Sequence, residues 1–279
     1  MLYSKKSLNG VYTIVLLAID IGNTSIKIGV FNRDNLVIAW QLSTELNRQA
    51  DEYGMLLLSL LQNKEVKASD IDGVILCSVV PPLVSTFQKT SEKYLGISPL
   101  TIEAGIKTGV RICVENPREL GPDRVVNAVA AHSLYGESVI VIDLGTATTF
   151  DVISKEGDYI GGVIAPGISI ASEALFLHTA ALPRIEFSRP MEVVGRNTVS
   201  AMQSGIFYGY IGLIENIVKR IEQYLACKTT VVATGGYSQL IDEITAIDKI
   251  EPNLTLVGLR LIYEMNTVEN SRGNCNAGR

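Results

Sequence analysis

The stretch VLLAIDIGNTSIKIGVF at residues 15–31 decides the fold, because it returns in altered form as SVIVIDLGTATTFDVI at residues 138–153. Each copy is an apolar, β-branched strand that ends in an aspartate, followed by a glycine turn and a second strand-like run. Asp20 and Asp143 are equivalent and lie 143 − 20 = 123 residues apart. The repeat predicts a duplicated domain, since this period is far too long for a solenoid.

Strand and helix signals alternate after each hairpin. Helical spacing is found at residues 51–63, 124–135 and 198–224, and buried strands are indicated at residues 73–79 and 229–233. This alternation predicts an α/β protein. Each half opens with an antiparallel hairpin, whereas a Rossmann unit would open with a strand and a helix.

The composition narrows the class of protein. With 47% hydrophobic residues in 279, the chain can bury a sizeable core, and its net charge of −5 argues against nucleic-acid binding. No apolar segment approaches the ~18 residues of a membrane span.

The four cysteines form no C-x-x-C pair and only two histidines are present, so a zinc site is not expected. Scattered thiols in a large core are typical of a reduced, cytoplasmic protein.

The first turn has the chemistry of a metal–phosphate site. Asp20 ends a buried strand and can hold Mg²⁺ directly or through water, while Gly22, Asn23 and Thr24 offer N–H and O–H donors to phosphate oxygens. Lys27 can contact the same phosphates. An ordinary hairpin, with Asp and Asn as turn formers, is the alternative for a single turn of this kind.

Two further turns favour the functional interpretation. The segment 143–149 repeats the arrangement with more hydroxyls, and Thr234-Gly235-Gly236 follows another strand, where a base or ribose can pack. Together the three turns resemble the phosphate and adenosine motifs of the actin, hexokinase and heat-shock-chaperone ATPase superfamily. No G-x-x-x-x-G-K-[ST] is present, which excludes a P-loop.

The superfamily resemblance implies duplicated ribonuclease-H-like (actin-like ATPase) domains, each a mixed sheet flanked by helices. We expect the first domain at residues 13–136 and the second at 137–266. Residues 1–12 and 267–279 lack an apolar period, and we expect them to be a loosely attached extension and a disordered tail.

A kinase also needs a base for the acceptor hydroxyl, and Gly121-Pro122-Asp123-Arg124 is the best candidate. Asp123 can accept the proton and Arg124 can orient an anionic group. Spacing alone favours a different interpretation, in which Asp123 is the N-cap of the helix that begins near Arg124.

Seven ordered motifs resemble the type III pantothenate kinase family and cover residues 16–263. They are D-x-G-N-T-x-x-K at 20–27, E-N-P-x-x-L-G-x-D-R at 115–124, D-x-G-T-A-T-T at 143–149, G-G-x-I-x-P-G at 161–167, T-A-x-L-P at 179–183, G-x-N-T-x-x-x-M-Q-x-G at 195–205 and T-G-G at 234–236. Any one of them alone is weak, and the ordered set is highly specific.

The resemblance implies an enzyme that phosphorylates pantothenate with ATP to 4′-phosphopantothenate, the first step of coenzyme A biosynthesis. It implies Asp143 as the site of a monovalent cation (K⁺ or NH₄⁺) and Asp123 as the general base. The residues implied for ATP are Asp20, Ile21, Gly22, Asn23, Thr24, Ser25, Ile26, Lys27 and Thr146, and those implied for pantothenate are Gly121, Pro122, Asp123, Arg124 and Thr198.

The resemblance further implies a homodimer with active sites at the subunit interface, to which the helix at 198–224 can contribute. One position departs from the family: Val114 stands where a tyrosine that contacts substrate is usual. The loss of its hydroxyl removes a hydrogen bond worth about 0.5–1.5 kcal/mol. His178 and Thr179 are weaker candidates for the pocket, and His132 falls in an apolar helix where packing suffices.

Three other functions are compatible with parts of the pattern. A kinase of the same fold can act on a sugar or another small alcohol, and some relatives of the family are accessory regulators of transcription. The intact Asp20, Asp123 and Asp143 argue against a purely regulatory role. A polymerising or chaperone-like ATPase is disfavoured because 279 residues leave no room for the additional subdomains.

Overall fold

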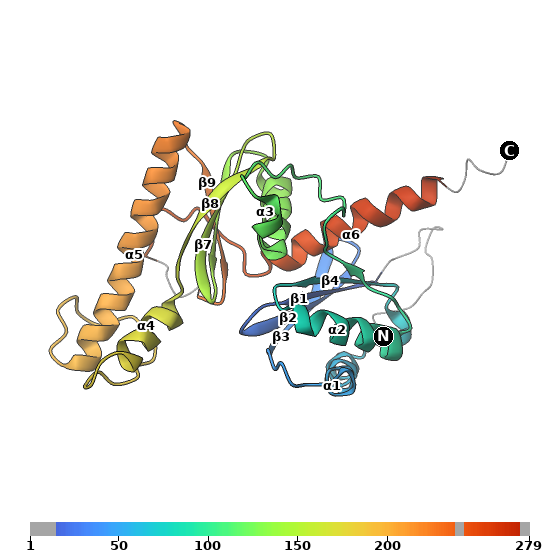
Figure 1. The fold of residues 1–279 in the computed structure, drawn as a ribbon, viewed down its shortest axis with the longest axis horizontal. Coiled ribbons are helices and arrows are strands. Elements are labelled where there is room, and N and C mark those ends of the chain that lie inside the picture. Colours follow the sequence, from blue (N-terminus) through green and yellow to red (C-terminus); the bar gives the residue numbers. More distant parts are fainter. Residues whose placement is uncertain (1–14, 238–242, 274–279) are drawn as a thin grey trace. The chain divides into compact units, whose positions relative to one another are not determined.

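The computed structural model describes residues 15–237 and 243–273 (Figure 1). The prediction for residues 1–12 lies outside these ranges, as does the prediction for residues 274–279. The chain forms two compact units, one made of residues up to 108, 118–129 and from 255 onward, the other of Gly109–Pro117 and Ala130–Leu254.

The first unit contains a five-stranded mixed sheet in the order β3-β2-β1-β4-β5. Its strands are β1 (Val15–Ile21), β2 (Ser25–Asn32), β3 (Asn35–Ser43), β4 (Gly73–Ser78) and β5 (Leu100–Thr101). The strands β1, β2 and β3 are antiparallel neighbours, while β4 runs parallel to β1 and β5 parallel to β4.

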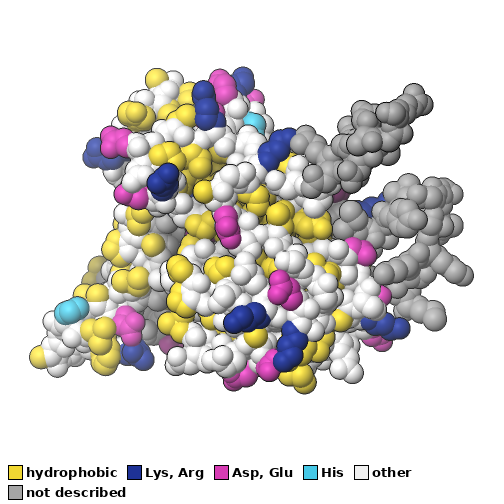
Figure 2. Space-filling view, turned by 45° about the vertical axis from the view of Figure 1, so that its right-hand side comes forward, with side chains coloured by type: hydrophobic (Ala, Val, Ile, Leu, Met, Phe, Trp, Pro, Cys, Tyr) yellow, Lys and Arg dark blue, Asp and Glu magenta, His cyan; other side chains and the backbone are white. Residues whose placement is uncertain are grey.

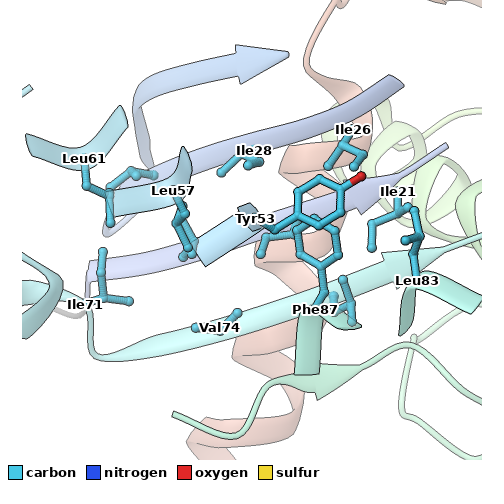
Figure 3. Close-up of a cluster of buried hydrophobic side chains, with 14 of the residues drawn as sticks. Ile21, Ile26, Ile28, Tyr53, Leu57, Leu61, Ile71, Val74, Leu83 and Phe87 are labelled. Atoms are coloured by element: carbon cyan, nitrogen blue, oxygen red, sulfur yellow. The ribbon is translucent and has the colours of Figure 1, made fainter. Parts of the chain in front are cut away.

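Helices α1 (Ala50–Asn63) and α2 (Pro81–Leu95) cover one face of this sheet. Alternate β1 residues point toward them, as the pleat requires, and form the cluster drawn in Figure 3, where Tyr53 and Phe87 lie with ring centroids 4.6 Å apart. Pro81 and Pro82 begin α2 because proline is tolerated in the first helical turn. The strand predicted at residues 73–79 is confirmed as β4, which ends at Ser78.

The other face of the first sheet contacts helix α6 (Leu254–Gly273). A Cβ built on Gly29 would lie 2.9 Å from Leu256, and one built on Gly73 would overlap the Tyr263 ring. The bare glycines therefore let the helix approach the strands closely. Asp20 and Cys77 leave the sheet on this α6 face, since they alternate with the residues that face α1 and α2.

The second unit repeats the topology with the order β10-β9-β6-β7-β8. Its strands are β6 (Val139–Leu144), β7 (Ala147–Ile153), β8 (Tyr159–Pro166), β9 (Thr230–Gly235) and β10 (Lys249–Ile250). The strands β6, β7 and β8 are antiparallel, and β9 runs parallel to β6. Each sheet thus has the same strand order, directions and hairpin start, which confirms the predicted duplicated ribonuclease-H-like fold.

Helix α5 (Thr198–Leu225) packs its apolar stripe on the second sheet (Figure 1). Met202, Ile206, Tyr210, Ile214, Val218 and Ile221 are the residues of this stripe that are buried. The predicted helix is confirmed, and its apolar surface is used within the chain. Helix α4 (Ile168–Leu177) precedes it and buries Ile168 in the same cluster.

The compact units differ from the predicted halves 13–136 and 137–266 at three places. Helix α3 (Pro122–Tyr135) is divided between the two units after Val129. Its last part belongs to the second unit, because the Tyr135 hydroxyl donates to Glu251 (2.9 Å) and His132 packs against Gly157. The segment 109–117 joins the second unit, since residues flanking Ile112 exchange backbone hydrogen bonds with Tyr159. Helix α6 belongs to the first unit, as its contacts above require.

The tail prediction at 267–279 is wrong for residues 267–273, which continue α6. Extending a formed helix costs little compared with starting one, so a polar segment without an apolar period can remain helical when a packed helix precedes it.

Candidate active site

The first turn joins β1 to β2 and is closed by short backbone contacts. Gly22 N–H donates to Ser25 O (2.9 Å), and the Thr44 hydroxyl donates to Gly22 O (2.7 Å). Asn23 and Thr24 at the tip are exposed, while Ser25 and Ile26 begin β2. The exposed tip offers donors for an anion, as the sequence predicts.

Asp20 and Lys27 lie opposite each other in the register of β1 and β2, so both side chains leave the same face of the sheet. Ile21 and Ile26 are the next register pair, and both are fully buried on the opposite face. The two isoleucines therefore anchor the turn in the core, while the charged pair remains half-buried beside it.

Cys77 lies beside Asp20 on the parallel neighbour β4 and is fully buried. Burial raises the pKa of its thiol well above the ordinary value, and the negative charges of Asp20 and Asp123 raise it further. Both carboxylates are therefore electrostatic neighbours of one thiol. The structure brings the predicted metal-binding aspartate and the predicted base together in the first unit.

Asp123 lies in the first turn of α3, which begins at Pro122. The interpretation of Asp123 as the N-cap is therefore wrong, because Gly121 precedes the helix and its carbonyl accepts from Arg124 N–H (3.1 Å). The Asp123 Oδ1 atom itself accepts from Arg124 N–H (2.9 Å). A Cβ on Gly121 would overlap this oxygen, so the glycine makes room for the carboxylate.

Burial raises the pKa of the Asp123 carboxyl above its ordinary value, although the hydrogen bond from Arg124 N–H and the Arg124 charge oppose the shift. The Asp123 side chain is half-buried at the start of α3. A raised pKa suits a group that must accept a proton near neutral pH.

The second turn joins β6 to β7. It is one residue shorter than the first turn when both are counted between the last paired residues of their strands. Three residues separate Leu144 from Thr148, whereas four separate Ile21 from Ile26. Gly145 N–H donates to Ala147 O (3.1 Å), and Thr146 at the tip is exposed. Thr146 is thus presented to solvent as a phosphate donor would be.

Two glycines hold other segments against this turn. A Cβ on Gly167 would lie well inside the contact distance of the carbonyls of Gly145 and Thr146, so the start of α4 touches the turn. Gly235 has φ +93°, and a Cβ there would lie 2.6 Å from Asp143 Oδ1. The β6–β7 turn, the T-G-G turn and the start of α4 therefore form one cluster within the second unit.

Tyr237 ties the T-G-G turn to the same cluster. Its N–H donates to Leu144 O (3.4 Å), its hydroxyl is 3.2 Å from Ser169 Oγ, and its ring meets Phe187 edge-on at 5.5 Å. The sequence pattern identified G-G-x-I-x-P-G as a family motif without a role, and the structure shows that its last glycine supports the second turn.

Thr198 begins α5 and is exposed, and it lines an open hollow of about 770 Å³ together with Asn197 and Arg196. The other residues that line this hollow are mostly apolar: Leu175, Leu182, Gly195, Ala201, Met202, Gly205 and Ile206. Asn197 caps the helix by accepting from Ser200 N–H (2.9 Å). The position suits a small substrate that has both polar and apolar parts.

The weaker candidates have identifiable structural roles. Thr179 accepts from Leu182 N–H and donates to Leu175 O (2.7 Å), which closes the turn after α4. His178 is the exposed C-cap residue of α4, and Val114 is half-buried in the bend before Pro117. His132 lies with Nε2 3.2 Å from Lys155 O, in agreement with a packing role.

Two sheets of this order, each with an aspartate one residue before the end of its central strand and a glycine turn after that strand, define a nucleotide-binding protein of the actin-like ATPase and kinase class. Residues 16–220 match the family model described as type III pantothenate kinase. The chain belongs to the type III pantothenate kinase family.

The curated relatives agree with this assignment. The type III pantothenate kinase of Dehalococcoides mccartyi (strain CBDB1) is 52% identical over 91% of this chain and 97% of its own. The Moorella thermoacetica protein of the same name is 50% identical over 91% of this chain and all of its own.

Solved structures share the fold at low identity. A Campylobacter jejuni protein provisionally described as a Baf family transcriptional activator has a TM-score of 0.57 at 20% identity, covering 90% of this chain and 98% of its own. The ethanolamine utilization protein EutJ from Carboxydothermus hydrogenoformans has a TM-score of 0.51 at 14% identity, covering 91% and 92%. These likenesses support the fold alone.

Proposed function

We propose that this chain transfers the γ-phosphoryl group of ATP to the primary hydroxyl of pantothenate, giving 4′-phosphopantothenate and ADP at the start of coenzyme A biosynthesis. The observation that carries the proposal is the placement of Asp123, a half-buried carboxylate of raised pKa that shares the neighbourhood of Cys77 with Asp20. Family membership supplies the substrate.

The two turns act on the ATP phosphates. In the first, Asp20–Lys27 supplies the exposed tip donors and the Lys27 ammonium, and in the second, Thr146 supplies a hydroxyl. Both turns have backbones closed by internal hydrogen bonds, so little reorganisation is needed when the phosphates bind.

Asp123 acts as the general base. The substrate oxygen forms a bond to the γ-phosphorus, the bond from that phosphorus to the β,γ-bridging oxygen breaks, and the substrate proton passes to the Asp123 carboxylate. The hydrogen bond from Arg124 N–H to Oδ1 fixes the rotation of this carboxylate. Positioning contributes most of the acceleration, since phosphoryl transfer asks little covalent chemistry of the protein.

Pantothenate has a carboxylate, two hydroxyls, an amide and two geminal methyl groups. We assign its binding to Gly121–Arg124 and Thr198, with the Arg124 guanidinium for an anionic group. The mostly apolar hollow at Thr198 is compatible with the methyl groups. Val114 offers no hydroxyl, so this contact of the usual family tyrosine is absent.

The residues present fit the cations that the family implies. Asp20 is a half-buried carboxylate at a strand end, the kind of ligand that Mg²⁺ shares with waters and phosphates. Asp143 is also half-buried, and within residues 15–237 and 243–273 the buried hydroxyl of its sheet neighbour Thr234 has no hydrogen-bond partner. When bound, Mg²⁺ at Asp20 and K⁺ or NH₄⁺ at Asp143 offset the charge of the phosphates.

We further propose a homodimer with active sites at the subunit interface. Several large apolar side chains of the second unit are exposed, among them Ile164, Leu177, Met191, Val193 and Val194. Met191, Val193 and Val194 are close in sequence, and exposed apolar side chains of this size are available for association. Light scattering coupled to gel filtration tests the dimer directly.

A cytoplasmic location without nucleic-acid partners agrees with the chemistry of the surface and the thiols. Cys77, Cys113 and Cys227 are free, as expected in a reducing compartment. Acidic and basic side chains are interspersed on the face shown in Figure 2.

No helix within residues 15–237 and 243–273 combines the length and apolar character needed to cross a bilayer.

Product analysis over a panel of acceptors tests the substrate. The purified protein, ATP and Mg²⁺ are incubated with pantothenate, with pantetheine and with hexoses, and the products are identified by phosphorus NMR. We expect a phosphomonoester from pantothenate at the primary carbon and none from the hexoses. Phosphorylation of a hexose in preference to pantothenate would reassign the chain to another kinase of the same fold.

A further inference from the structure

The duplicated sheets place different side chains beside their two equivalent aspartates. The parallel neighbour of Asp20 is Cys77, and the parallel neighbour of Asp143 is Thr234. Both neighbours are fully buried. Because register partners on adjacent strands leave the same face of a sheet, each aspartate has its neighbour's sulfur or hydroxyl on its own face.

The Thr234 hydroxyl oxygen is buried and has no hydrogen-bond partner among the residues that the structure describes. Thr148, on the opposite face of the same sheet, is the other described residue of the second unit with such a hydroxyl. Buried hydroxyls are normally satisfied, since an unsatisfied one is costly, and a valine of the same shape would avoid the cost. A threonine in this position is therefore expected to meet a partner other than the residues that the structure describes.

The geometry around Asp143 limits the kind of partner. Its Oδ1 leans toward β9, because a Cβ built on Gly235 would lie 2.6 Å from that atom. The carboxylate is thus directed toward the strand that carries Thr234. A carboxylate oxygen and a hydroxyl oxygen on one face of adjacent strands are ligands of the type that hard cations prefer.

We infer that the Thr234 hydroxyl is a second protein ligand of the monovalent cation held at Asp143. The inference rests on the cation site of the proposed function and adds a residue to it. It also distinguishes the two units: in the first, the equivalent neighbour is Cys77, whose sulfur is a softer ligand than a hydroxyl oxygen and suits a hard monovalent cation less well.

The test measures cation binding rather than turnover. Thermal unfolding of the full-length protein is followed against K⁺ concentration, with choline chloride holding the ionic strength constant, with and without ADP. Thallium(I) NMR gives a second, direct reading of cation occupancy. Thr234→Val removes the oxygen and keeps the shape, and Thr234→Ser restores it.

Thr148→Val is the matched control. Thr148 also has a fully buried hydroxyl without a hydrogen-bond partner, but it pairs with Leu144 and faces the opposite side of the same sheet. Asp143→Asn is the reference for complete loss of the site.

We expect Thr234→Val to weaken K⁺ binding about ten-fold or more, while Thr234→Ser and Thr148→Val remain close to the wild type. Equal K⁺ affinity in Thr234→Val and wild type, with the loss confined to Asp143→Asn, would overturn the role of Thr234 and leave the Asp143 site standing. A wild type that K⁺ stabilises no more than choline would overturn both, and the acceptor panel would then decide the kinase activity separately.

Discussion

The two phosphate turns differ in what holds them, although they follow equivalent strands. The first turn is closed by residues of neighbouring strands: Gly22 N–H donates to the Ser25 carbonyl, and the hydroxyl of Thr44, directly after β3, donates to the Gly22 carbonyl. The second is held by segments distant in sequence, since Gly167 and Gly235 bring the start of α4 and the end of β9 against it. The neighbours of the aspartates differ as well, Cys77 in one unit and Thr234 in the other.

Under the proposed function, the two units contribute different groups to one reaction. The first unit places two carboxylates, Asp20 and Asp123, near one buried thiol. The second unit places the Asp143 carboxylate beside the Thr234 hydroxyl, next to a turn that Gly167 and Gly235 contact closely. We assign the base to the first unit and the monovalent cation to the second.

The largest expected effect comes from removing the base of the first unit. Asp123→Asn should lower kcat by about 10²–10⁴-fold, because the amide cannot accept the proton, while ATP binding is largely retained. The amide oxygen can still accept from Arg124 N–H. Steady-state kinetics and ADP-binding calorimetry measure the two quantities, with Glu156→Gln, an exposed carboxylate of the β7–β8 turn, as control. Unchanged turnover would remove Asp123 from the mechanism.

The next effect tests the support of the second turn. Gly167→Ala should destabilise the protein by about 1–3 kcal/mol and raise the KM for ATP, because its Cβ would collide with the Gly145 and Thr146 carbonyls. Gly145→Ala is the control for stability, since its Cβ would meet nothing closer than Asp143 Oδ1 at 3.4 Å. Denaturant unfolding of both variants gives the comparison, and equal destabilisation would contradict it.

A smaller effect is expected at the first turn. Thr44→Val should cost about 0.5–1.5 kcal/mol, because it removes the 2.7 Å hydrogen bond to Gly22 O. Thr44→Ser keeps the hydroxyl and should lie near the wild type. If urea unfolding gave the same midpoint for valine, serine and wild type, the contact would have no part in holding the turn.

The last prediction concerns the pH dependence of stability. The pKa of Asp123 is raised by folding, so the folded state binds more protons than the unfolded state between about pH 4 and the raised pKa. The ionisation of Asp123 therefore lowers the free energy of unfolding as pH rises through that window, and it has no such effect at lower pH. Asp123→Asn should become more stable relative to wild type from pH 4 to 7. Thermal unfolding across this range checks the sign, and a constant difference would contradict it.

The sequence predicted the parts of the fold that local pattern determines. The repeat around Asp20 and Asp143 indicated the duplicated sheets, and helical spacing identified α1, α3 and α5. The division into units was not predictable in this way, because α6 returns to the first sheet through contacts at Gly29 and Gly73 that only the folded chain reveals.

The candidate site was predictable to a similar extent. Turn chemistry and motif order identified Asp123, Thr146 and Thr198, and the structure places each at an element start or a turn tip. Cys77 carried no signal, because a cysteine within an apolar strand has the pattern of any buried residue, and Thr234 was identified only as the first residue of the T-G-G motif. Their relation to the aspartates depends on strand register, which sequence spacing does not give.

The measurement that tests the central claim most directly is ADP release with ATP and Mg²⁺, with and without pantothenate, in K⁺ buffer and again in Na⁺ buffer. The account predicts release that requires pantothenate and is much faster in K⁺, because one unit supplies the base and the other the cation. ADP release indifferent to pantothenate would contradict the assigned substrate. Pantothenate-dependent ADP release that is equally fast in Na⁺ would contradict the assignment of the base to the first unit and of a K⁺ site to the second.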